Sequence, residues 1–304
     1  MLYNYIRLLN LTKILIAILF IIGFSSCDKF DGNQTVPTYV HIDKITLLDN
    51  GNNMGSLSSS ITDAWFYVDD QYIGTFELPA TFPVLLKGSH TIKVLAGIKM
   101  NGIANTRVAY PFYNTMVLTK TFNENETMNL GTLTTQYDPN TKMEWMENFE
   151  DGGISLQKST VNSGSDTNVI KTNQAGYVFE GLYSGVVALD SNMNFFEIET
   201  IQKYTLPRGA SPVFLEMDYK INNTVNVGLD AYTSNTPTQI STMVLLPTTQ
   251  WKKIYINFTP DISNNATADN FRVFFGQFKN TGVTKATLLF DNIKLVHFNT
   301  TKKK

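Results

Sequence analysis

Short runs of alternating hydrophobic and polar residues dominate the chain from Pro37 onward. Each run is rich in β-branched and aromatic residues, and turn-forming Gly, Asn, Asp or Pro residues bound it. No segment after residue 26 carries a helical apolar stripe of ten or more residues. The pattern therefore predicts an all-β protein made of antiparallel sandwiches, whose strands have one buried and one solvated face. The clearest runs are residues 39–45, 64–68, 91–95, 213–219, 251–258 and 271–276.

A polar stretch at residues 132–142 interrupts this pattern. It contains Pro139 and has no apolar period, as is typical of a connection between domains. We place the boundary near Asp138 and expect two β-sandwich domains in series, at residues 37–138 and 139–304.

The first of these domains contains a recognisable motif at residues 64–94, AWFYVDDQYIGTFELPATFPVLLKGSHTIKV. A strand, an Asp-rich turn, Gly74, the pair Leu78-Pro79 and Gly88 follow one another in the order found in PEGA-like surface β modules. The segment resembles that family, which implies a small β-sandwich. It departs from the family at the PEGA tetrad itself, where Leu86-Lys87-Gly88-Ser89 stands instead.

Both ends of the second domain carry motifs as well. It opens with WMENFEDGG at Trp145–Gly153 and closes with ATLLFDNIKLV at Ala286–Val296. These ends resemble the carbohydrate-binding-like and galactose-binding-like jelly rolls, which implies that the second sandwich is a jelly roll. The resemblance also implies a structural calcium ion held by the acidic residues of the two motifs, here Glu150, Asp151 and Asp291.

The N-terminal segment is interpreted as a signal peptide over residues 1–26. Arg7 and Lys13 are followed by an apolar run at 14–24, which is short for a bilayer span. It ends in Phe24-Ser25-Ser26-Cys27, and Cys27 is the only cysteine. This ending resembles the lipobox of bacterial lipoproteins, which implies cleavage before Cys27 and its acylation, for example by palmitate. An uncleaved N-terminal anchor is the alternative.

A short polar tether, residues 27–36, follows the cysteine. Asp28 and Asp31 loosely resemble the signal that exports Bacteroidota lipoproteins to the outer face of the outer membrane. We therefore expect a lipid-anchored outer-membrane protein, and we favour the cell surface over the periplasm. Two or more acyl chains would make that anchoring stable.

Composition narrows the function classes. Only 16% of residues are charged, and 24 basic against 26 acidic residues give a net charge of −2, so nucleic acid is not an expected partner. The single cysteine excludes a disulfide framework. His41, His90 and His297 are the only histidines and lie far apart in the sequence, so a zinc site or a histidine-based triad is not expected.

Candidate binding residues are aromatic. Trp65, Trp145 and Trp251 are sugar-stacking candidates, but core packing is the alternative for a tryptophan within a strand. Tyr232 is the preferred ligand-binding residue because Asp230–Asn235 is interpreted as a loop.

Two groups of acidic residues are candidates for a catalytic carboxylate pair: Glu147, Glu150 and Asp151, or Glu216 and Asp218. Glu216 and Asp218 lie two residues apart in a predicted strand, and we interpret them as part of its solvated face.

We expect a non-catalytic protein, and two hypotheses compete for its function. The first is an accessory or scaffold subunit of an outer-membrane β-barrel complex for transport, secretion or outer-membrane protein assembly. It is motivated by the tether and by the aromatic-rich, weakly charged composition. The alternative is a glycan-binding surface lipoprotein of a polysaccharide uptake system. A glycoside hydrolase ranks third, because it needs two carboxyl groups in one cleft.

Overall fold

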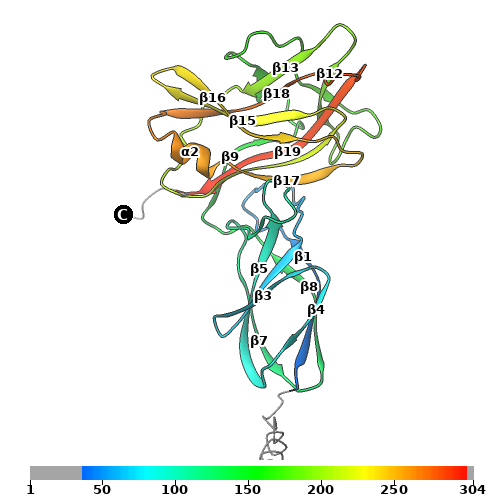
Figure 1. Cartoon of the computed structure of the whole chain (residues 1–304), viewed down its shortest axis with the longest axis vertical. Helices are drawn as coiled ribbons and strands as arrows, with labels where there is room; N and C mark the ends of the chain where they lie inside the picture. The colour runs from blue at the N-terminus through cyan, green and yellow to red at the C-terminus, as the bar shows by residue number, and fades with distance from the viewer. Residues whose placement is uncertain (1–35, 300–304) are drawn as a thin grey trace, which may run out of the picture.

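The computed structural model describes residues 36–299, which fold almost entirely into strands (Figure 1). Within this range the one helix is α2 (Thr259–Asn264). No helix of these residues has the length and apolar character needed to cross a membrane. The predicted signal segment and the predicted lipidation site Cys27 lie outside the described residues, so both stay predictions.

The strands form two bodies stacked end to end (Figure 1). In the first, β4, β1 and β8 make one sheet, with β1 parallel to β8, and β3, β2, β5, β6 and β7 make the other. The strands are β1 (Thr38–Leu47), β2 (Asp63–Val68), β3 (Gln71–Glu77), β4 (Ala80–Val84), β5 (Gly88–Lys99), β6 (Arg107–Ala109), β7 (Met116–Phe122) and β8 (Thr127–Thr135).

The second body is a jelly-roll sandwich of two antiparallel sheets. One sheet has the order β10-β13-β18-β15-β16, and the other has the order β11-β12-β19-β14-β17, with β9 paired to β19. The strands are β9 (Thr141–Glu147), β10 (Leu156–Lys158), β11 (Ile170–Thr172), β12 (Ser184–Leu189), β13 (Phe195–Thr200), β14 (Val213–Ile221), β15 (Val225–Thr233), β16 (Thr236–Leu245), β17 (Lys252–Asn257), β18 (Asn270–Phe278) and β19 (Ala286–Phe298).

The all-β fold class, with two β-sandwiches of which the second is a jelly roll, is thus confirmed. β8 ends at Thr135 and β9 begins at Thr141. We propose to divide the chain into two domains at this connection.

Each sandwich buries its own hydrophobic core, but the two cores are not separate. The core of the first domain continues into Phe214, Tyr255 and Val296 of the second. Tyr110 packs edge to face on Phe214 with ring centroids 5.4 Å apart. Buried aromatic contact of this kind couples the two domains mechanically, because separating them would expose large apolar surfaces to water.

The prediction of a solvated face on β14 is wrong. Every residue of this strand except Lys220 is buried. Val213, Leu215 and Met217 face the core of the jelly roll, whereas the alternate residues face the first domain. Sequence alternation marks one buried face, but it does not reveal a second face that another domain covers.

A buried polar network fills this interface. The Glu216 carboxylate is fully buried and accepts hydrogen bonds from the hydroxyls of Tyr110 (2.6 Å) and Tyr137 (2.8 Å). Lys253 Nζ lies 3.5 Å from Glu216 Oε2, and Lys294 Nζ donates to Tyr137 Oη at 3.3 Å. Burial, the largest cause, lowers the pKa of Lys294 to about 8. A buried carboxylate needs such partners, since desolvation without them costs several kcal/mol.

Candidate functional site

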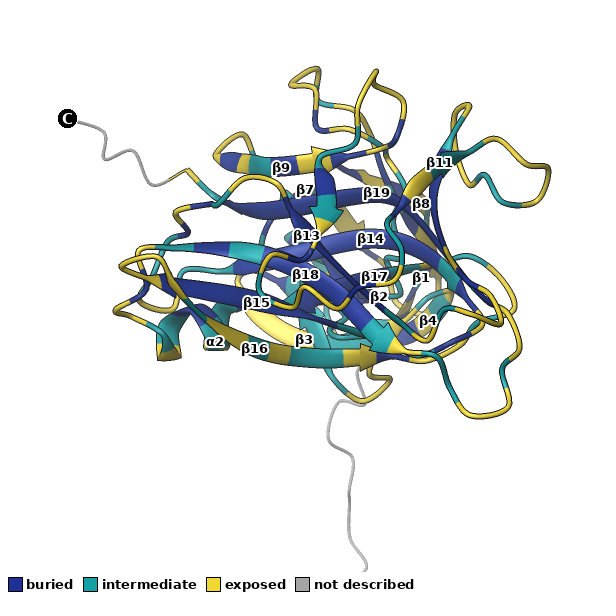
Figure 2. Ribbon diagram, turned by 90° about the horizontal axis from the view of Figure 1, so that it is seen from above, coloured by how far each residue is buried: buried dark blue, intermediate teal, exposed yellow. Residues whose placement is uncertain are grey.

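One face of the jelly roll points away from the first domain. It is the outer face of the sheet β10-β13-β18-β15-β16, which lies at the far end of the molecule in Figure 1. Figure 2 shows its central strands β15 and β18 coloured as buried along most of their length, although no second domain covers them. Side chains must therefore fill this face.

Two glycines make room for these side chains. A Cβ atom on Gly276 would lie 2.7 Å from Glu197 Cγ, so the Glu197 side chain lies across that glycine. A Cβ atom on Gly228 would lie 2.7 Å from the Phe274 ring and only 2.0 Å from the Ile240 carbonyl oxygen. The absence of side chains at both positions lets Glu197 and Phe274 lie flat on the sheet.

Glu199 is the centre of a dense set of hydrogen bonds on this face. Its Oε1 accepts from the Thr160 hydroxyl (2.9 Å), from Gln157 Nε2 (3.1 Å) and from the Arg272 guanidinium. Within residues 36–299, its Oε2 is buried without a hydrogen-bond partner, and so is Arg272 Nε. The carboxylate and the guanidinium therefore each keep an unused hydrogen-bonding position.

Gln239 connects two further carboxyl groups. From the edge strand β16, its Nε2 donates to Asp230 Oδ1 (3.2 Å) and reaches Glu197 Oε1 on β13 (3.1 Å). Asp230 Oδ2 is buried and has no hydrogen-bond partner in the described part of the chain. Burial, the largest cause, and the neighbouring carboxylates of Glu199 and Glu197 raise the pKa of Asp230 to about 7.

The sequence-based interpretation of Tyr232 needs correction. Residues 230–233 are not a loop but the end of β15, and the turn that follows is Ser234-Asn235. Tyr232 is only 5% exposed, because Lys203 Nζ covers its ring at 3.6 Å from the centroid. Its ring is therefore not an open stacking surface, but its buried hydroxyl has no hydrogen-bond partner among the residues that the structure describes.

These side chains form what we call the outer-face cluster. Eight buried side-chain polar atoms in residues 36–299 lack a hydrogen-bond partner, and four of them belong to this cluster. Buried polar groups are normally satisfied, so such a concentration requires an explanation, and a ligand is one. The cluster consists of Glu197, Glu199, Asp230, Tyr232, Gln239 and Arg272.

A partly exposed aromatic pair lies on the same face. Phe195 on β13 is paired in register with Phe278 on β18, and their ring centroids are 4.7 Å apart. Phe278 is 64% exposed. Phe195 shares its strand face with Glu197 and Glu199, because side chains alternate along a strand.

The predicted calcium ligands do not come together as a site. No group of three or more His, Cys, Asp or Glu residues in the described part of the chain is arranged to hold a metal ion. Glu150 Oε1 instead accepts the backbone N–H groups of Leu182 and Tyr183, and Asp291 Oδ2 accepts from the Ser184 hydroxyl at 2.5 Å. Asp151 is exposed and its carbonyl oxygen accepts from a lysine. Backbone and hydroxyl donors thus contact Glu150 Oε1 and Asp291 Oδ2, whereas Asp151 takes part through its main-chain carbonyl.

The three tryptophans differ in their surroundings. Trp145 is buried in the core and donates through its Nε1 to the Ser155 hydroxyl. Trp65 lies half-buried on β2 beside Tyr72. Trp251 precedes β17 rather than lying within a strand, and it is half-buried.

The histidines form contacts with acidic residues. His297 is buried against Glu144, while His41 and His90 contact Asp43 and Asp69. The hydrogen bond to Asp69, the largest cause, raises the pKa of His90.

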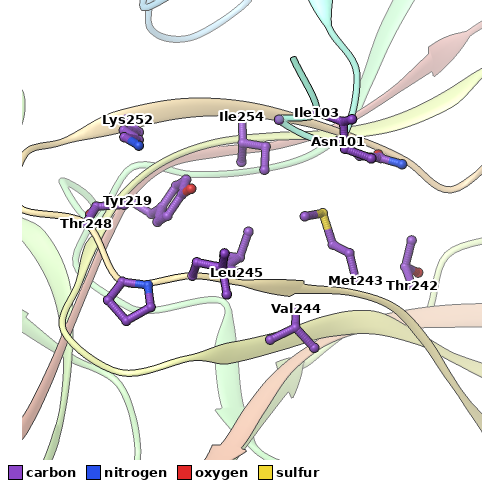
Figure 3. A pocket seen from close by; sticks show the side chains of 13 residues that line it. Asn101, Ile103, Tyr219, Thr242, Met243, Val244, Leu245, Thr248, Lys252 and Ile254 are labelled. Atoms are coloured by element: carbon purple, nitrogen blue, oxygen red, sulfur yellow. The ribbon is translucent and has the colours of Figure 1, made fainter. Parts of the chain in front are cut away.

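A cavity of about 470 Å³ opens where the edge strands β16 and β17 approach each other. Figure 3 shows Ile254 and Tyr219 on one side of it and Leu245 and Met243 on the other. The 101–103 turn of the first domain closes one end. Because its lining is mainly apolar, it has fewer hydrogen-bonding groups than the outer-face cluster.

Sequence reasoning missed most of the cluster. Glu197 and Glu199 are spaced two apart within a strand-like run, which does indicate that both lie on one face. Nothing in the sequence, however, shows that Arg272 and Gln239 from other strands lie beside them. Only strand order brings these residues together.

Comparisons with known proteins find distant structural likeness alone. No protein-family model matches the chain, and no curated protein matches it. The C-terminal family 22 carbohydrate-binding module of Xyn10B from Clostridium thermocellum is similar at 10% identity, with a TM-score of 0.38, over 55% of this chain and 99% of that chain.

Two further solved structures are similar to this chain. The xylan-binding domain CBM22-1 of Xyn10C from Paenibacillus barcinonensis has 10% identity and a TM-score of 0.36, over 52% of this chain and 94% of that chain. A family 11 carbohydrate-binding module from Clostridium thermocellum, in complex with a β-1,3-1,4-mixed-linked tetrasaccharide, has 16% identity and a TM-score of 0.33, over 49% and 92%.

Proposed function

We propose that this protein is a glycan-binding protein and that the outer face of its jelly roll holds the glycan. The observation that carries the proposal is one alignment: the Phe195–Phe278 pair, of which Phe278 is exposed, and the polar atoms of the outer-face cluster that lack a partner among the described residues share one sheet face. Sugars present apolar C–H faces together with hydroxyl groups. A surface that offers both an aromatic platform and unused donors and acceptors complements that chemistry.

The spacing suits an extended oligosaccharide. Phe195 and Glu199 lie four residues apart on β13, and a strand rises by about 3.4 Å per residue, so Phe195 and Glu199 are about 14 Å apart along the strand. A chain of a few sugar rings would span this distance. One ring would stack on Phe278, and hydroxyls further along would meet Glu199 and Arg272.

Flexible side chains cover the cluster in the free protein. Gln239 is exposed and lies over Asp230, while Lys203 lies over the Tyr232 ring. Both are long side chains that rotate at low cost. Their displacement by a ligand would open the unpartnered oxygens of Asp230 and Tyr232 to hydroxyl groups.

Affinity gel electrophoresis tests the proposal. The protein is run through gels that contain one of a panel of soluble neutral and acidic polysaccharides. We expect retardation on at least one of them. The Phe278→Ala variant should then bind about tenfold more weakly, equivalent to about 1.4 kcal/mol.

Tyr72→Ala is the matched control, because Tyr72 is also an exposed aromatic residue but lies on β3 of the first domain. It should bind like the wild type. Absence of retardation on every polysaccharide, by protein whose near-ultraviolet circular dichroism shows it to be folded, would contradict the proposal.

Anchoring is a separate proposal. We propose that Cys27 is acylated and holds the protein at the outer membrane, on the cell surface. In Figure 1 the outer face lies at the end of the molecule opposite the start of β1, so a tether before β1 would leave that face free. Metabolic labelling with a fatty-acid analogue should label the wild type but not Cys27→Ala.

The site favours the glycan-binding hypothesis over the β-barrel one. A role as accessory subunit of a barrel complex stays a prediction. Purification from native membranes in mild detergent, followed by identification of co-eluting proteins, tests it.

A further inference from the structure

A second pocket lies between the two domains and shares no residue with the outer-face cluster. It has a volume of about 460 Å³, which is within the usual range of small-molecule sites. Segments from four parts of the chain line it: the connection between β1 and β2, the connection between β11 and β12, strand β14, and the start of β17 with the residue before it. The lining residues are Ser58, Ser59, Ser60, Phe179, Asp218, Trp251, Lys252 and Lys253.

Two aromatic side chains form one wall. Phe179 and Trp251 pack with ring centroids 5.3 Å apart and an interplanar angle of 49°. Phe179 is 38% exposed and Trp251 is half-buried. Large aromatic side chains that stay partly open beside a pocket offer a flat apolar surface, which suits the C–H face of a sugar ring.

The inner end of the pocket is polar, and it contains the ammonium group of Lys253. The side chain of Lys253 is 3% exposed, and its Nζ forms no hydrogen bond within residues 36–299. It lies 3.5 Å from Glu216 Oε2 and 3.8 Å from Asp218 Oδ2, as an ion pair. A buried ammonium group normally donates hydrogen bonds to nearby acceptors. Lys253 therefore has N–H donors available for a ligand hydroxyl.

The buried charges at the inner end of the pocket pair with one another, which favours a neutral ligand there. Lys253 and Lys294 face the carboxyl groups of Glu216 and Asp218, whereas Lys252, which also lines the pocket, is exposed. Asp218 is held in place by the Ser58 hydroxyl (2.8 Å). A ligand with a full charge would leave this buried set unbalanced, whereas a neutral ligand would not.

The rim supplies further polar groups from the first domain. Ser59 and Ser60 are half-buried, and their hydroxyls form no hydrogen bond with other described residues. The backbone N–H of Ser60 donates to Tyr255 Oη at 2.9 Å, which fixes this segment against the jelly roll. The pocket is therefore complete only while the two domains are docked.

We propose that this interdomain pocket is a second carbohydrate site, which binds one neutral pyranose residue that stacks on Trp251 and Phe179 and hydrogen-bonds to Lys253 and the serine rim. The inference extends the ligand class of the proposed function to a new site, but it does not depend on the outer face. A terminal sugar fits best, because the pocket ends at buried ion pairs and gives a polymer no exit on that side.

Saturation-transfer difference NMR on the full protein tests the site, with methyl α- and β-glycosides of glucose, galactose, mannose and xylose as probes. At least one glycoside should show transfer to its ring protons. The signal should fall at least fivefold in Trp251→Ala and in Phe179→Ala, and Trp251→Phe should retain part of it. Trp65→Ala is the matched control, since it removes a half-buried indole from β2, and it should keep the full signal.

Two outcomes would overturn the inference: no transfer to any glycoside, or an equal signal in wild type and Trp251→Ala. Near-ultraviolet circular dichroism verifies that each variant is folded. If Trp251→Ala does not fold, Phe179→Ala takes its place in the test. Phe278→Ala separates the two sites. If polysaccharide retardation fails while glycosides still bind in a Trp251-dependent manner, the outer-face proposal is wrong and the interdomain site stands.

Discussion

The hydroxyl of Tyr110 donates to Glu216 Oε1 at 2.6 Å, across the interface between the two domains. Both side chains are almost fully buried. Burial, the largest cause, together with the carboxylate raises the pKa of Tyr110 well above its usual value, so the phenol keeps its proton. The phenol is therefore the donor in this contact, which joins the domains through a charge-assisted hydrogen bond.

We expect Tyr110→Phe to lower the free energy of unfolding by about 1.5 to 3 kcal/mol, the range for a buried hydrogen bond to a charged group. Urea unfolding followed by circular dichroism measures it. Tyr113→Phe is the control, because the Tyr113 hydroxyl meets only the neutral Tyr255 hydroxyl, at 3.3 Å. A loss in Tyr113→Phe as large as that in Tyr110→Phe would show that the carboxylate has no special role.

Asp230 makes stability depend on pH. Its pKa is about 7 in the folded protein and 3.8 in the absence of the fold, so the folded state binds more protons between these values. The contribution of Asp230 to stability is thus fully present below about pH 4 and is lost as the pH rises through about 7. Asp230→Asn removes this dependence and should be more stable than wild type at pH 8, by on the order of 2 kcal/mol.

The measurement is urea unfolding of both proteins at pH 4, 6 and 8. The difference between the free energies of unfolding of Asp230→Asn and wild type should grow from pH 4 to pH 8. A difference that is constant with pH would mean that Asp230 is ionised throughout this range in the folded protein.

Gly228 should tolerate no side chain. Its Cβ would lie 2.0 Å from the Ile240 carbonyl oxygen, a backbone atom that cannot move without breaking the pairing of β15 and β16. We expect Gly228→Ala to destabilise the protein by about 3 kcal/mol, at the upper end of the cost of overpacking. Thermal unfolding of Gly228→Ala and wild type measures this loss of stability as a lower midpoint temperature.

Gly152→Ala is the comparison for this variant, because nothing lies within 4 Å of a Cβ at Gly152. It should change the unfolding free energy by less than about 0.5 kcal/mol. Similar midpoints for the two variants would indicate that β16 moves away from β15 more easily than the pairing suggests.

Tyr232→Phe separates folding from binding. The Tyr232 hydroxyl is buried without a partner, so its removal should leave stability unchanged or raise it slightly. If the hydroxyl meets the glycan, however, the same change should weaken retardation on polysaccharide gels about fivefold. A stability loss above 1 kcal/mol would show instead that the hydroxyl has a structural partner.

Much of the strand pattern was predictable from sequence, because alternation reports directly on which residues face a core. The run at residues 271–276 lies within β18, and the run at 64–68 lies within β2. The interpretation of residues 230–235 as a loop was wrong for its first four residues. Asp230 is a residue type that favours turns, yet both Asp230 and Tyr232 lie on β15, which pairs with β16 on one side and β18 on the other.

The candidate site was less predictable, because it depends on residues brought together by strand order. Glu199, Arg272 and Gln239 come from three strands, and no local pattern relates them. The three residues predicted as calcium ligands also depend on tertiary structure. Asp291 is buried, and its Oδ2 accepts a hydrogen bond from the Ser184 hydroxyl, a contact that the motif alone does not predict.

By itself, the sequence determined that this protein is all-β and that its surface carries few charges, because alternation and composition are local properties of the chain. Only the tertiary structure decided which strands are buried on both faces, one against their own core and the other against the neighbouring domain. Glu216 and Asp218 were expected on a solvated face, but the first domain covers them and supplies their hydrogen bonds. A strand encodes which residues share a face, whereas the environment of that face depends on what packs against it.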